Sequence, residues 1–392
     1  MTERKIKVAY VINSVLVAGA ETTLFETASH LGRERFSPVV YVLGDYGDGR
    51  PTLVPRFAQA NIPLIFLSPG KKLGVISALT SLRRMFRKER PDVIHAHLPD
   101  AVIASGIAAI LLRIPFIIHE HQTHKFHSWK IRLAYRFLRL FAALTITYAE
   151  TLEAELFGTT HVLRDPPERL AYSSYTVHNG IDVDRVKTTL SSLDRDRKRH
   201  ECGFTKDDVI ITSVARFVEW KGHQLLVEAF ASVADHIPNA RLFILGNGPL
   251  LEPLRARARE LHLENRISLP GARNDIYEIL GSSDIFSLAF VYPDGVDAEA
   301  IGIAGFEAMA FGLPVVIGDY AGARTYLGDN ERGMIVAPRD RDALAQALVR
   351  LVNDKQYRQQ LGDAARVFVA RELDWNVLIK VYERIYTLIV NL

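Results

Sequence analysis

The chain has 392 residues, 48% of them hydrophobic and 24% charged, which is typical of globular proteins and long enough for two domains. Its single cysteine, Cys202, excludes an intramolecular disulfide framework and favours a reducing compartment. The first residues lack a signal-peptide pattern, and the longest apolar run, residues 101–112, is too short to span a bilayer. We therefore expect a cytoplasmic protein.

The net charge of +3 is unevenly distributed along the chain. Residues 1–176 hold 22 Lys and Arg against 15 Asp and Glu, whereas the remainder holds 26 against 30. The excess lies mainly in residues 71–90 and 125–140. Basic segments of this kind suit an anionic membrane surface or an anionic acceptor. No nucleic-acid-binding motif accompanies them, so we expect no nucleic-acid partner.

The second basic segment, residues 125–140, contains no acidic residue. Helical spacing places three of its arginines in one stripe, beside an apolar face: Arg132, Arg136 and Arg139 next to Trp129, Leu133, Phe137 and Phe141. This pattern predicts either peripheral contact with the inner face of a membrane or the solvated face of a packed helix.

Short apolar segments alternate with helix-length amphipathic segments along the whole chain. Strands are predicted at residues 6–12, 37–44, 62–68, 92–97, 115–121 and 143–149 of the first half, and at 209–215, 240–246, 266–271, 284–290, 314–318 and 333–338 of the second. Such alternation is typical of parallel sheets with helical crossovers.

Two α/β domains of the Rossmann-like, doubly wound kind follow from this pattern. We predict an N-terminal domain over 1–175 and a second domain over 186–373, with the hinge in 166–186. The apolar segment 374–392 is predicted to be a helix that packs elsewhere in the molecule. Ligands of such sheets bind at strand-to-helix turns, where helix N-termini offer unpaired N–H groups.

Several of these turns carry residues that suit an anionic ligand. Arg216 follows one predicted strand and Lys221 precedes the next helix, so both can converge on one anion such as a diphosphate, although surface charge is the commoner role of such a pair. Gly246 opens a tight turn in GNG that resembles an incomplete dinucleotide fingerprint. Gly19 and Ala20 form a turn with little side chain, which permits close approach of a ligand or simple helix–sheet clearance.

Histidines are dense in two places, HAH at 95–97 and HEHQTHKFH at 119–127. Strand alternation puts His119 and His121 on one face, which suggests a zinc site, but no carboxylate or thiolate set with zinc-site spacing accompanies them. We therefore expect no metal site, and a single functional histidine, His121, at a strand end.

Two glutamates, Glu299 and Glu307, bracket the small-residue run AIGIAG. A helix is predicted over 303–311, with Gly312 as its stop. Eight residues of helix span ~12 Å at ~1.5 Å per residue, too far for the two carboxylates to share one proton. They can instead hold two hydroxyl-bearing ends of one long ligand, while the helix N-terminus takes its phosphates. A nucleotide sugar has this form.

These motifs together resemble the retaining GT-B glycosyltransferases of family GT4. The resemblance covers nearly the whole chain and rests on the order of the motifs: GAETTL, PDVIHAH, IIHEH, HNGID, VARFVEWKG, LGNGP, PGARNDIYEIL, and Glu299 and Glu307 followed by AMAFGLPVV. It implies two Rossmann-like domains facing a cleft, with a C-terminal helix that crosses back to the first domain.

The resemblance also implies a role for each site residue. Arg216 and Lys221 would neutralise the donor diphosphate, Glu307 would hold the ribose, and Glu299 the donor sugar. The backbone of Gly302, Ile303 and Ala304 would contact sugar and phosphate. Gly19, with Ala20, would leave room for the diphosphate, and His121 would face the sugar. The turn from Arg273 to Ile276 would border the base, and Gly246 would lie near the ligand.

The leading hypothesis is a metal-independent transferase that moves a sugar from a UDP-sugar, or a GDP-sugar, to a lipid-linked or cell-surface glycan acceptor. The two DRD sequences, at 194–196 and 340–342, lie in hinge-like and helix-start contexts rather than at a strand end. The alternatives are a nucleotide-sugar epimerase on the same fold, a catalytically silent relative that binds nucleotide or membrane, and, more distantly, an NAD dehydrogenase.

Overall fold

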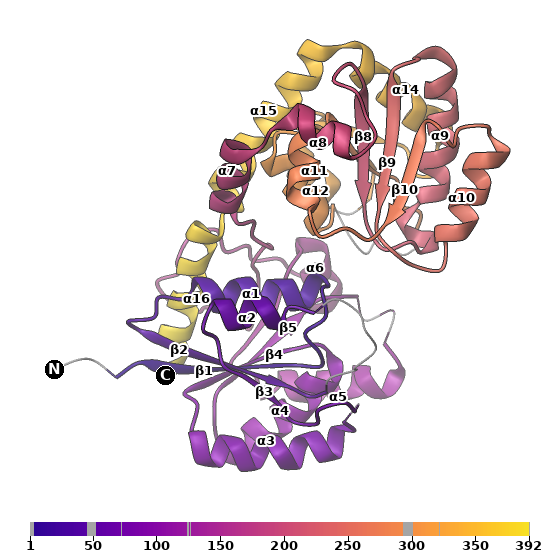
Figure 1. The fold of residues 1–392 in the computed structure, drawn as a ribbon. Coiled ribbons are helices and arrows are strands. Elements are labelled where there is room, and N and C mark those ends of the chain that lie inside the picture. The colour runs from indigo at the N-terminus through magenta and orange to yellow at the C-terminus, as the bar shows by residue number, and fades with distance from the viewer. Residues whose placement is uncertain are drawn as a thin grey trace. The chain divides into compact units, whose positions relative to one another are not determined.

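The structure, a computed structural model, describes residues 4–44, 52–71, 73–123, 125, 127–292, 301–320 and 322–391. The chain divides into two compact units: unit 1 comprises residues 1–180 and 375–392, and unit 2 comprises residues 181–374 (Figure 1). Each unit is built around one parallel sheet. The predicted pair of doubly wound α/β domains is confirmed.

The sheet of unit 1 has seven parallel strands in the order β3-β2-β1-β4-β5-β6-β7. Its strands are β1 (Ile6–Ile12), β2 (Phe36–Val42), β3 (Leu64–Phe66), β4 (Val93–His97), β5 (Phe116–Glu120), β6 (Leu144–Thr147) and β7 (Ser174–Thr176). The first six were predicted, and β7, only three residues long, lies inside the predicted hinge. The order reverses between β1 and β4, so their carboxyl ends border a crevice.

Helices cover both faces of this sheet. Apolar residues of α1 (Gly19–His30), α2 (Val54–Gln59) and α16 (Trp375–Val390) pack on one face. The opposite face packs against α3 (Val75–Glu89), α4 (Pro99–Leu112) and α5 (Trp129–Arg139). The remaining helix, α6 (Glu150–Phe157), lies between β6 and β7 in the chain.

The last helix, α16, belongs to unit 1 although it follows unit 2 in the chain. Its Tyr386 hydroxyl lies 2.9 Å from the Tyr10 hydroxyl of β1 and 2.7 Å from Nδ1 of His95 in β4. Gly180, in the HNGID motif, lies so close to the Trp375 ring that a Cβ there would be 2.7 Å from it. The chain therefore passes between the units twice, after Gly180 and after Asp374.

The sheet of unit 2 has six parallel strands in the order β10-β9-β8-β11-β12-β13. The strands are β8 (Val209–Val214), β9 (Ala240–Leu245), β10 (Ile267–Gly271), β11 (Ile285–Leu288), β12 (Val315–Gly318) and β13 (Gly333–Val336). All six were predicted. The order reverses between β8 and β11, which places the second crevice at their carboxyl ends.

Two apolar cores flank this second sheet. One contains α9 (His223–His236), α10 (Leu251–Glu260) and α14 (Arg341–Asn353). The other contains α7 (Val183–Ser192), α11 (Ile276–Ser282), α12 (Ile303–Ala310), α13 (Ala323–Leu327) and α15 (Lys355–Glu372). A short helix, α8 (Arg195–Glu201), precedes β8.

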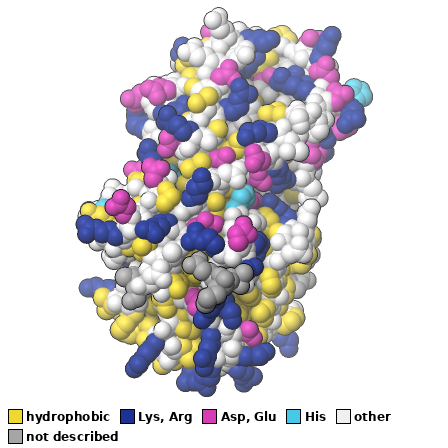
Figure 2. Space-filling view, turned by 90° about the vertical axis from the view of Figure 1, so that its left-hand side faces the viewer, with side chains coloured by type: hydrophobic (Ala, Val, Ile, Leu, Met, Phe, Trp, Pro, Cys, Tyr) yellow, Lys and Arg dark blue, Asp and Glu magenta, His cyan; other side chains and the backbone are white. Residues whose placement is uncertain are grey.

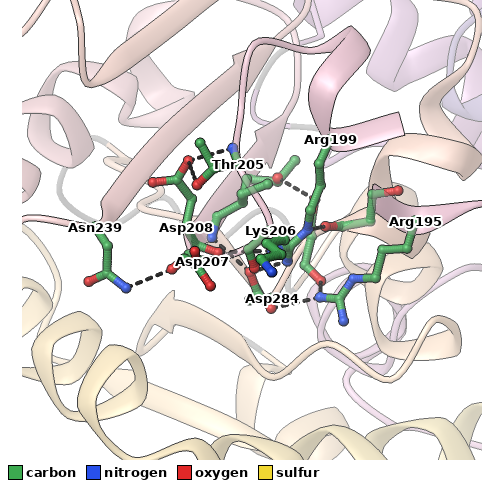
Figure 3. A network of polar contacts seen from close by, with 12 residues as sticks. Arg195, Arg199, Thr205, Lys206, Asp207, Asp208, Asn239 and Asp284 are labelled. Carbon is green, nitrogen blue, oxygen red and sulfur yellow. Dashed lines mark hydrogen bonds and ion pairs between the residues drawn. The ribbon is translucent and has the colours of Figure 1, made fainter. Parts of the chain in front are cut away.

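The amino edge of this sheet is closed by a network of charged groups (Figure 3). Asp284, just before β11, accepts hydrogen bonds from Arg199 and Arg195, both at 2.7 Å, and from the backbone N–H of Ile210 at 2.8 Å. Arg199 is 4% exposed and also donates to the carbonyls of Lys206 and Asp208. The charges of Asp284, Arg199 and Arg195 are thus partnered within the fold, which is typical of a structural network.

Candidate functional site

Two cations follow β8 and share one aromatic ring. The turn after the strand contains the 3-10 helix η2 (Glu219–Lys221) and ends at Gly222, the N-cap of α9. The Lys221 amine lies 4.1 Å from the centre of the Trp220 ring, and the Arg216 guanidinium carbon lies 5.9 Å from it. The structure thus brings the two predicted cations together at the carboxyl end of β8.

These cations differ in burial. Lys221 is only 9% exposed, and its amine also lies 4.7 Å from the centre of the Phe290 ring, just after β11. Arg216 is exposed, and it forms no ion pair with any residue that the structure describes. In contrast to Arg199, Arg216 therefore keeps its charge available for an anion from outside the chain.

Glycines bring the neighbouring turns into contact with this one. Gly222 has φ +68°, and a Cβ there would overlap the carbonyl of Ala289 beyond β11. Gly246, after β9, has φ +143°, and its Cβ would overlap the carbonyl of Ala215 beyond β8. Only glycine tolerates both the conformation and the close approach. The predicted tight turn at Gly246 thus lies directly beside the turn that carries Arg216.

The N-terminus of α12 lies on the other side of the switch point, after β11. Gly302 is its N-cap, with φ +74°, followed by Ile303 and Ala304, both partly exposed. The first N–H groups of a helix lack intrahelical acceptors and carry partial positive charge. Glu307 lies in the second turn and is also partly exposed. Glu299, the other predicted acid, lies outside the described residues.

The turn after β10 is held by an ion pair. Arg273 donates from Nε to Asp275 Oδ1 at 2.8 Å, and Lys198 lies 3.1 Å from Asp275 Oδ2. Hydrogen bonds from Arg273, and then from Lys198, hold the pKa of Asp275 well below its usual range. Ile276 begins α11 immediately after this pair. The Arg273 side chain is thus engaged by its own turn, and the base contact predicted for Arg273 and Ile276 stays a prediction.

In unit 1, Gly19 and Ala20 begin α1 at the switch point between β1 and β4. Gly19 is exposed and Ala20 is buried. Thr23, one turn later, donates to the Gly19 carbonyl at 3.0 Å and lies 2.9 Å from Oδ1 of Asn179 in the HNGID motif. Gly19 is thus exposed and has no side chain, and the close approach of a diphosphate to its backbone stays a prediction.

His121 follows β5 and lies at the edge of a stack of imidazole rings. The His121 and His119 ring centres are 4.3 Å apart at 18°, and those of His119 and His95 are 5.2 Å apart at 7°. Nε2 of His121 lies 2.8 Å from Nδ1 of His97. Strand register explains the stack, because His97 of β4 is paired beside His119 of β5.

Burial makes this whole stack neutral at physiological pH. Burial lowers the pKa of His121 to about 3. The pKa of His95 is also lowered to about 3, mainly by burial and to a lesser extent by repulsion from His121. Burial, followed by the charges of the neighbouring rings, holds the pKa values of His97 and His119 well below their usual range. His121 is therefore a neutral group at pH 7, unsuited to carry positive charge.

Three of these histidines, His95, His97 and His119, each offer a ring nitrogen within 4.8 Å of the others. Metal ligands direct their lone pairs to one point, in the ring plane. The rings of His95 and His119 lie in nearly parallel planes, and Nδ1 of His119 forms a hydrogen bond with Nε2 of His95 at 3.2 Å instead. The arrangement fits hydrogen bonding better than coordination, and the absence of a metal requirement stays a prediction.

Two features of the site were missed by sequence reasoning. Trp220 holds both cations, although its place between Arg216 and Lys221 in the motif was visible. His97 contacts His121, although HAH was noticed only as a dense histidine segment. Both depend on which side chains meet across turns or strands, and a single sequence does not report that.

Two family models match the chain in tandem. Glycosyltransferase Family 4 covers residues 17–185, and Glycosyl transferases group 1 covers residues 194–368. Unit 1 and unit 2 therefore each carry their own match.

Curated relatives and solved structures extend this likeness to the whole chain. The Escherichia coli UDP-Gal:alpha-D-GlcNAc-diphosphoundecaprenol alpha-1,3-galactosyltransferase is 27% identical over 369 residues, which cover 90% of each chain. A Mycobacterium tuberculosis GDP-mannose-dependent alpha-(1-6)-phosphatidylinositol monomannoside mannosyltransferase is 30% identical over 202 residues, 51% of this chain and 52% of the relative. The crystal structure of Anabaena HepE in complex with UDP superimposes with a TM-score of 0.78 at 21% identity, covering 98% of this chain and 99% of the other.

Two parallel-sheet units of this topology, with cations and a helix N-terminus at the switch point of the second, define a glycosyltransferase of the GT-B fold. More narrowly, the chain belongs to glycosyltransferase family GT4.

Proposed function

We propose that this protein transfers a sugar from a nucleotide diphosphate sugar to an acceptor hydroxyl, with retention of configuration at the anomeric carbon. The observation that carries the proposal is the pair of cations on Trp220, of which Arg216 has no ion-pair partner among the described residues. Together with the N–H groups at the start of α12, they form a positive site at the switch point of unit 2, where a diphosphate is stabilised.

The proposed chemistry is stabilisation of the leaving group. The bond between the anomeric carbon and the diphosphate oxygen breaks while the acceptor oxygen bonds to the same face of that carbon. The acceptor proton passes to the departing phosphate. Arg216 and Lys221 neutralise the negative charge that develops on the diphosphate, the interaction that contributes most in such reactions. No metal is required because two cations and a helix N-terminus supply the positive charge.

The remaining roles complete the proposed donor site. Glu307 holds the ribose hydroxyls and Glu299 the sugar hydroxyls. His121 contacts the sugar through a hydrogen bond, because a neutral imidazole both donates and accepts. Glu299 acts by binding and not as a nucleophile, so a covalent glycosyl adduct trapped on Glu299 contradicts this mechanism.

We favour a UDP-sugar as donor and a lipid-linked glycan intermediate as acceptor. The relative that matches 90% of the chain is named for UDP-Gal and a diphosphoundecaprenol acceptor, and HepE was crystallised with UDP. The mycobacterial relative is named for GDP-mannose, so a GDP-sugar is the second candidate donor. Both names specify a lipid acceptor.

The surface that α5 and α3 present on unit 1 supports a peripheral contact with the cytoplasmic face of a membrane. No described helix is long and apolar enough to cross a bilayer. On α5, however, the apolar residues predicted to form a face are exposed: Trp129 64%, Leu133 60%, Phe137 52%, and, just beyond the helix, Phe141 52%. Leu140, which was not predicted to join them, is 77% exposed. The buried side of α5 consists of Tyr135 and Leu138.

Basic residues surround this apolar surface. Arg132 and Arg136 are exposed on α5, whereas Arg139, predicted to join them, instead donates to the buried carboxylate of Glu120 at 2.6 Å.

A groove on the same helical layer is lined by Leu79, Thr80, Arg83, Arg84, Arg87 and Leu111. Its three arginines form no ion pair with any described residue. Figure 2 shows Lys and Arg side chains gathered along the end of unit 1 that α3 forms. Exposed aromatic residues beside unpaired cations suit an anionic bilayer.

The experiment that tests the donor site is calorimetric titration with UDP, GDP and ADP in EDTA. We compare the native protein with an Arg216→Ala/Lys221→Ala double variant, and with a control that removes two exposed cations of unit 2, Arg259→Ala/Lys355→Ala. We expect one nucleotide to bind the native and control proteins and not the double variant. Equal nucleotide affinity of the native protein and the double variant contradicts the proposed site. Loss of nucleotide binding to the native protein in EDTA contradicts metal independence.

Transfer is distinguished from its alternatives by incubating the donor sugar with and without acceptor. A transferase releases nucleoside diphosphate in proportion to glycosylated acceptor. Conversion of the donor without acceptor supports an epimerase, and nucleotide binding with neither reaction supports a catalytically silent relative.

A further inference from the structure

His97 and His121 form a hydrogen-bonded pair of stacked rings at the carboxyl edge of the unit 1 sheet. Nδ1 of His97 lies 2.8 Å from Nε2 of His121, and the ring centres are 5.1 Å apart at 23°. His97 is fully buried, whereas His121 is partly exposed. Nδ1 of His121 has no hydrogen-bond partner in the part of the chain that the structure describes.

The environment of His97 decides which ring carries the shared proton. Each neutral imidazole has one N–H donor and one bare nitrogen, so one ring donates and the other accepts. Nε2 of His97 is buried and has no partner among the described residues. If His97 accepted at Nδ1, its own proton would lie on this Nε2, as a buried N–H without an acceptor. Unpaired buried N–H groups are rarer in native structures than unpaired buried acceptors, which disfavours this tautomer.

The opposite assignment leaves a bare nitrogen, and not an N–H group, unpaired in the buried ring of His97. His97 then carries its proton on Nδ1 and donates it to Nε2 of His121. His121 must in turn carry its proton on Nδ1, the nitrogen that has no partner in the described chain. Neighbouring rings restrict rotation of His121, since His119 stacks against it at 4.3 Å.

We propose that His97 is a positioning residue that holds His121 in the tautomer protonated at Nδ1, so that His121 presents a neutral N–H donor to an oxygen of the bound sugar. The identity of that ligand rests on the proposed function. The chemical consequence is specific: His121 donates a hydrogen bond through Nδ1 and has no free nitrogen there to act as a base. A low pKa of His121, about 3, keeps this donor neutral at physiological pH.

The tautomer is measured directly by long-range ¹H–¹⁵N correlation spectra of protein labelled with ¹⁵N-histidine, at pH 7 and without substrate. We expect His121 to show a protonated Nδ1 and a bare Nε2. In His97→Leu the donor is lost, and His121 should shift toward the Nε2-protonated form that free histidine favours in water. His97→Asn should restore the native pattern, because an asparagine amide places an N–H near the position of Nδ1. His236→Leu, at an exposed histidine, should leave the His121 signals unchanged.

A His121 protonated at Nε2 in the native protein overturns the proposal, as does a His97→Leu spectrum identical to the native one. These readouts need no substrate, so they decide the tautomer even if no glycosyl transfer is found. The folding of each variant is checked by circular dichroism, and His97→Asn gives a second test if His97→Leu unfolds.

The sugar contact is tested by kinetics with the donor that calorimetry identifies. Loss of one well-placed hydrogen bond should lower kcat/KM by roughly tenfold in His97→Leu, with recovery to near the native value in His97→Asn. Adding His97→Leu to His121→Ala should cause little further loss, because His97 acts through His121. Losses that multiply in the double variant contradict this coupling.

Discussion

The amine of Lys221 lies 4.1 Å from the ring centre of its neighbour Trp220, and the Arg216 guanidinium lies over the same ring. The same ring thus attracts two positive charges, and this attraction offsets part of the repulsion between them. Attraction to the ring face, worth ~0.5–2 kcal/mol per cation, helps to hold both near the carboxyl end of β8.

Trp220→Leu should therefore weaken nucleotide binding without removing either charge. We expect Kd to rise by roughly twofold to thirtyfold, which corresponds to the same ~0.5–2 kcal/mol. Trp220→Phe, which keeps an aromatic face, should lose less. Calorimetric titration measures both variants, and equal affinity of Trp220→Leu and native protein contradicts a role for the ring.

Gly246 is expected to be irreplaceable for steric reasons. Gly246→Ala introduces a Cβ into the Ala215 carbonyl and forces alanine to φ +143°. Gly203→Ala is the matched control, because Gly203 has φ +83° but nothing within 4 Å of the added Cβ. The control should lose about 1–2 kcal/mol of unfolding free energy, and Gly246→Ala a further ~1–3 kcal/mol, together with nucleotide affinity. Urea denaturation compares them, and equal losses contradict the steric argument.

The network at the amino edge of the unit 2 sheet should affect stability and not nucleotide affinity. Arg199→Met leaves the Asp284 carboxylate, 13% exposed, without its most buried partner, and should cost ~3–5 kcal/mol. Arg195→Met removes the half-exposed partner of the same carboxylate and should cost ~0–1 kcal/mol. Thermal denaturation measures the difference. A changed nucleotide Kd in folded Arg199→Met protein contradicts a purely structural role.

Membrane docking predicts a dependence on both apolar and basic residues of unit 1. A Trp129→Ser/Leu133→Ser/Phe137→Ser variant should lose binding to vesicles rich in phosphatidylglycerol. The control Val367→Ser removes an apolar residue of unit 2 that is 64% exposed, and it should bind normally.

Neutralising the arginines of the α3 groove tests the electrostatic part. Each of Arg83→Gln, Arg84→Gln and Arg87→Gln should cost ~1 kcal/mol of vesicle affinity, roughly fivefold, and less at high salt. Co-sedimentation measures both sets of variants. Equal binding to phosphatidylcholine and phosphatidylglycerol vesicles contradicts docking by charge.

The histidine stack predicts that unit 1 loses stability in mild acid. The folded protein keeps the imidazoles neutral, with lowered pKa values, whereas the unfolded chain binds protons below pH ~6.5. The unfolding free energy therefore falls as pH drops below ~6.5, and for His95 and His121 it continues to fall until pH is near their folded pKa of about 3.

Each such histidine adds up to ~1.4 kcal/mol per pH unit to this slope. His119→Leu should make the unfolding free energy of unit 1 less dependent on pH between 7 and 5, whereas His236→Leu, at an exposed site, should not. Urea denaturation at several pH values measures the slope. An unchanged slope in His119→Leu contradicts the neutral state of that ring.

Local pattern was sufficient to predict most of the fold. All strands except β7 were recognised, because alternation of apolar strands and amphipathic helices depends on nearby residues alone. β7 was missed because three residues carry too little periodicity. The apolar stripe of α5 was also recognised, but not its exposure: periodicity shows that a face exists, and only packing decides whether another element covers it.

At the site, Arg216, Lys221 and Gly246 could be recognised because each follows a predicted strand or precedes a predicted helix. Glu307 could be recognised because it lies near the start of a predicted helix. The sequence by itself thus determined the fold class and the family, and it predicted the turns at which a donor should bind. The tertiary structure alone decided that Trp220 holds both cations, that Arg139 pairs with Glu120, and that His97 reaches His121. These contacts join residues through strand register and helix packing, which are set by the whole chain at once.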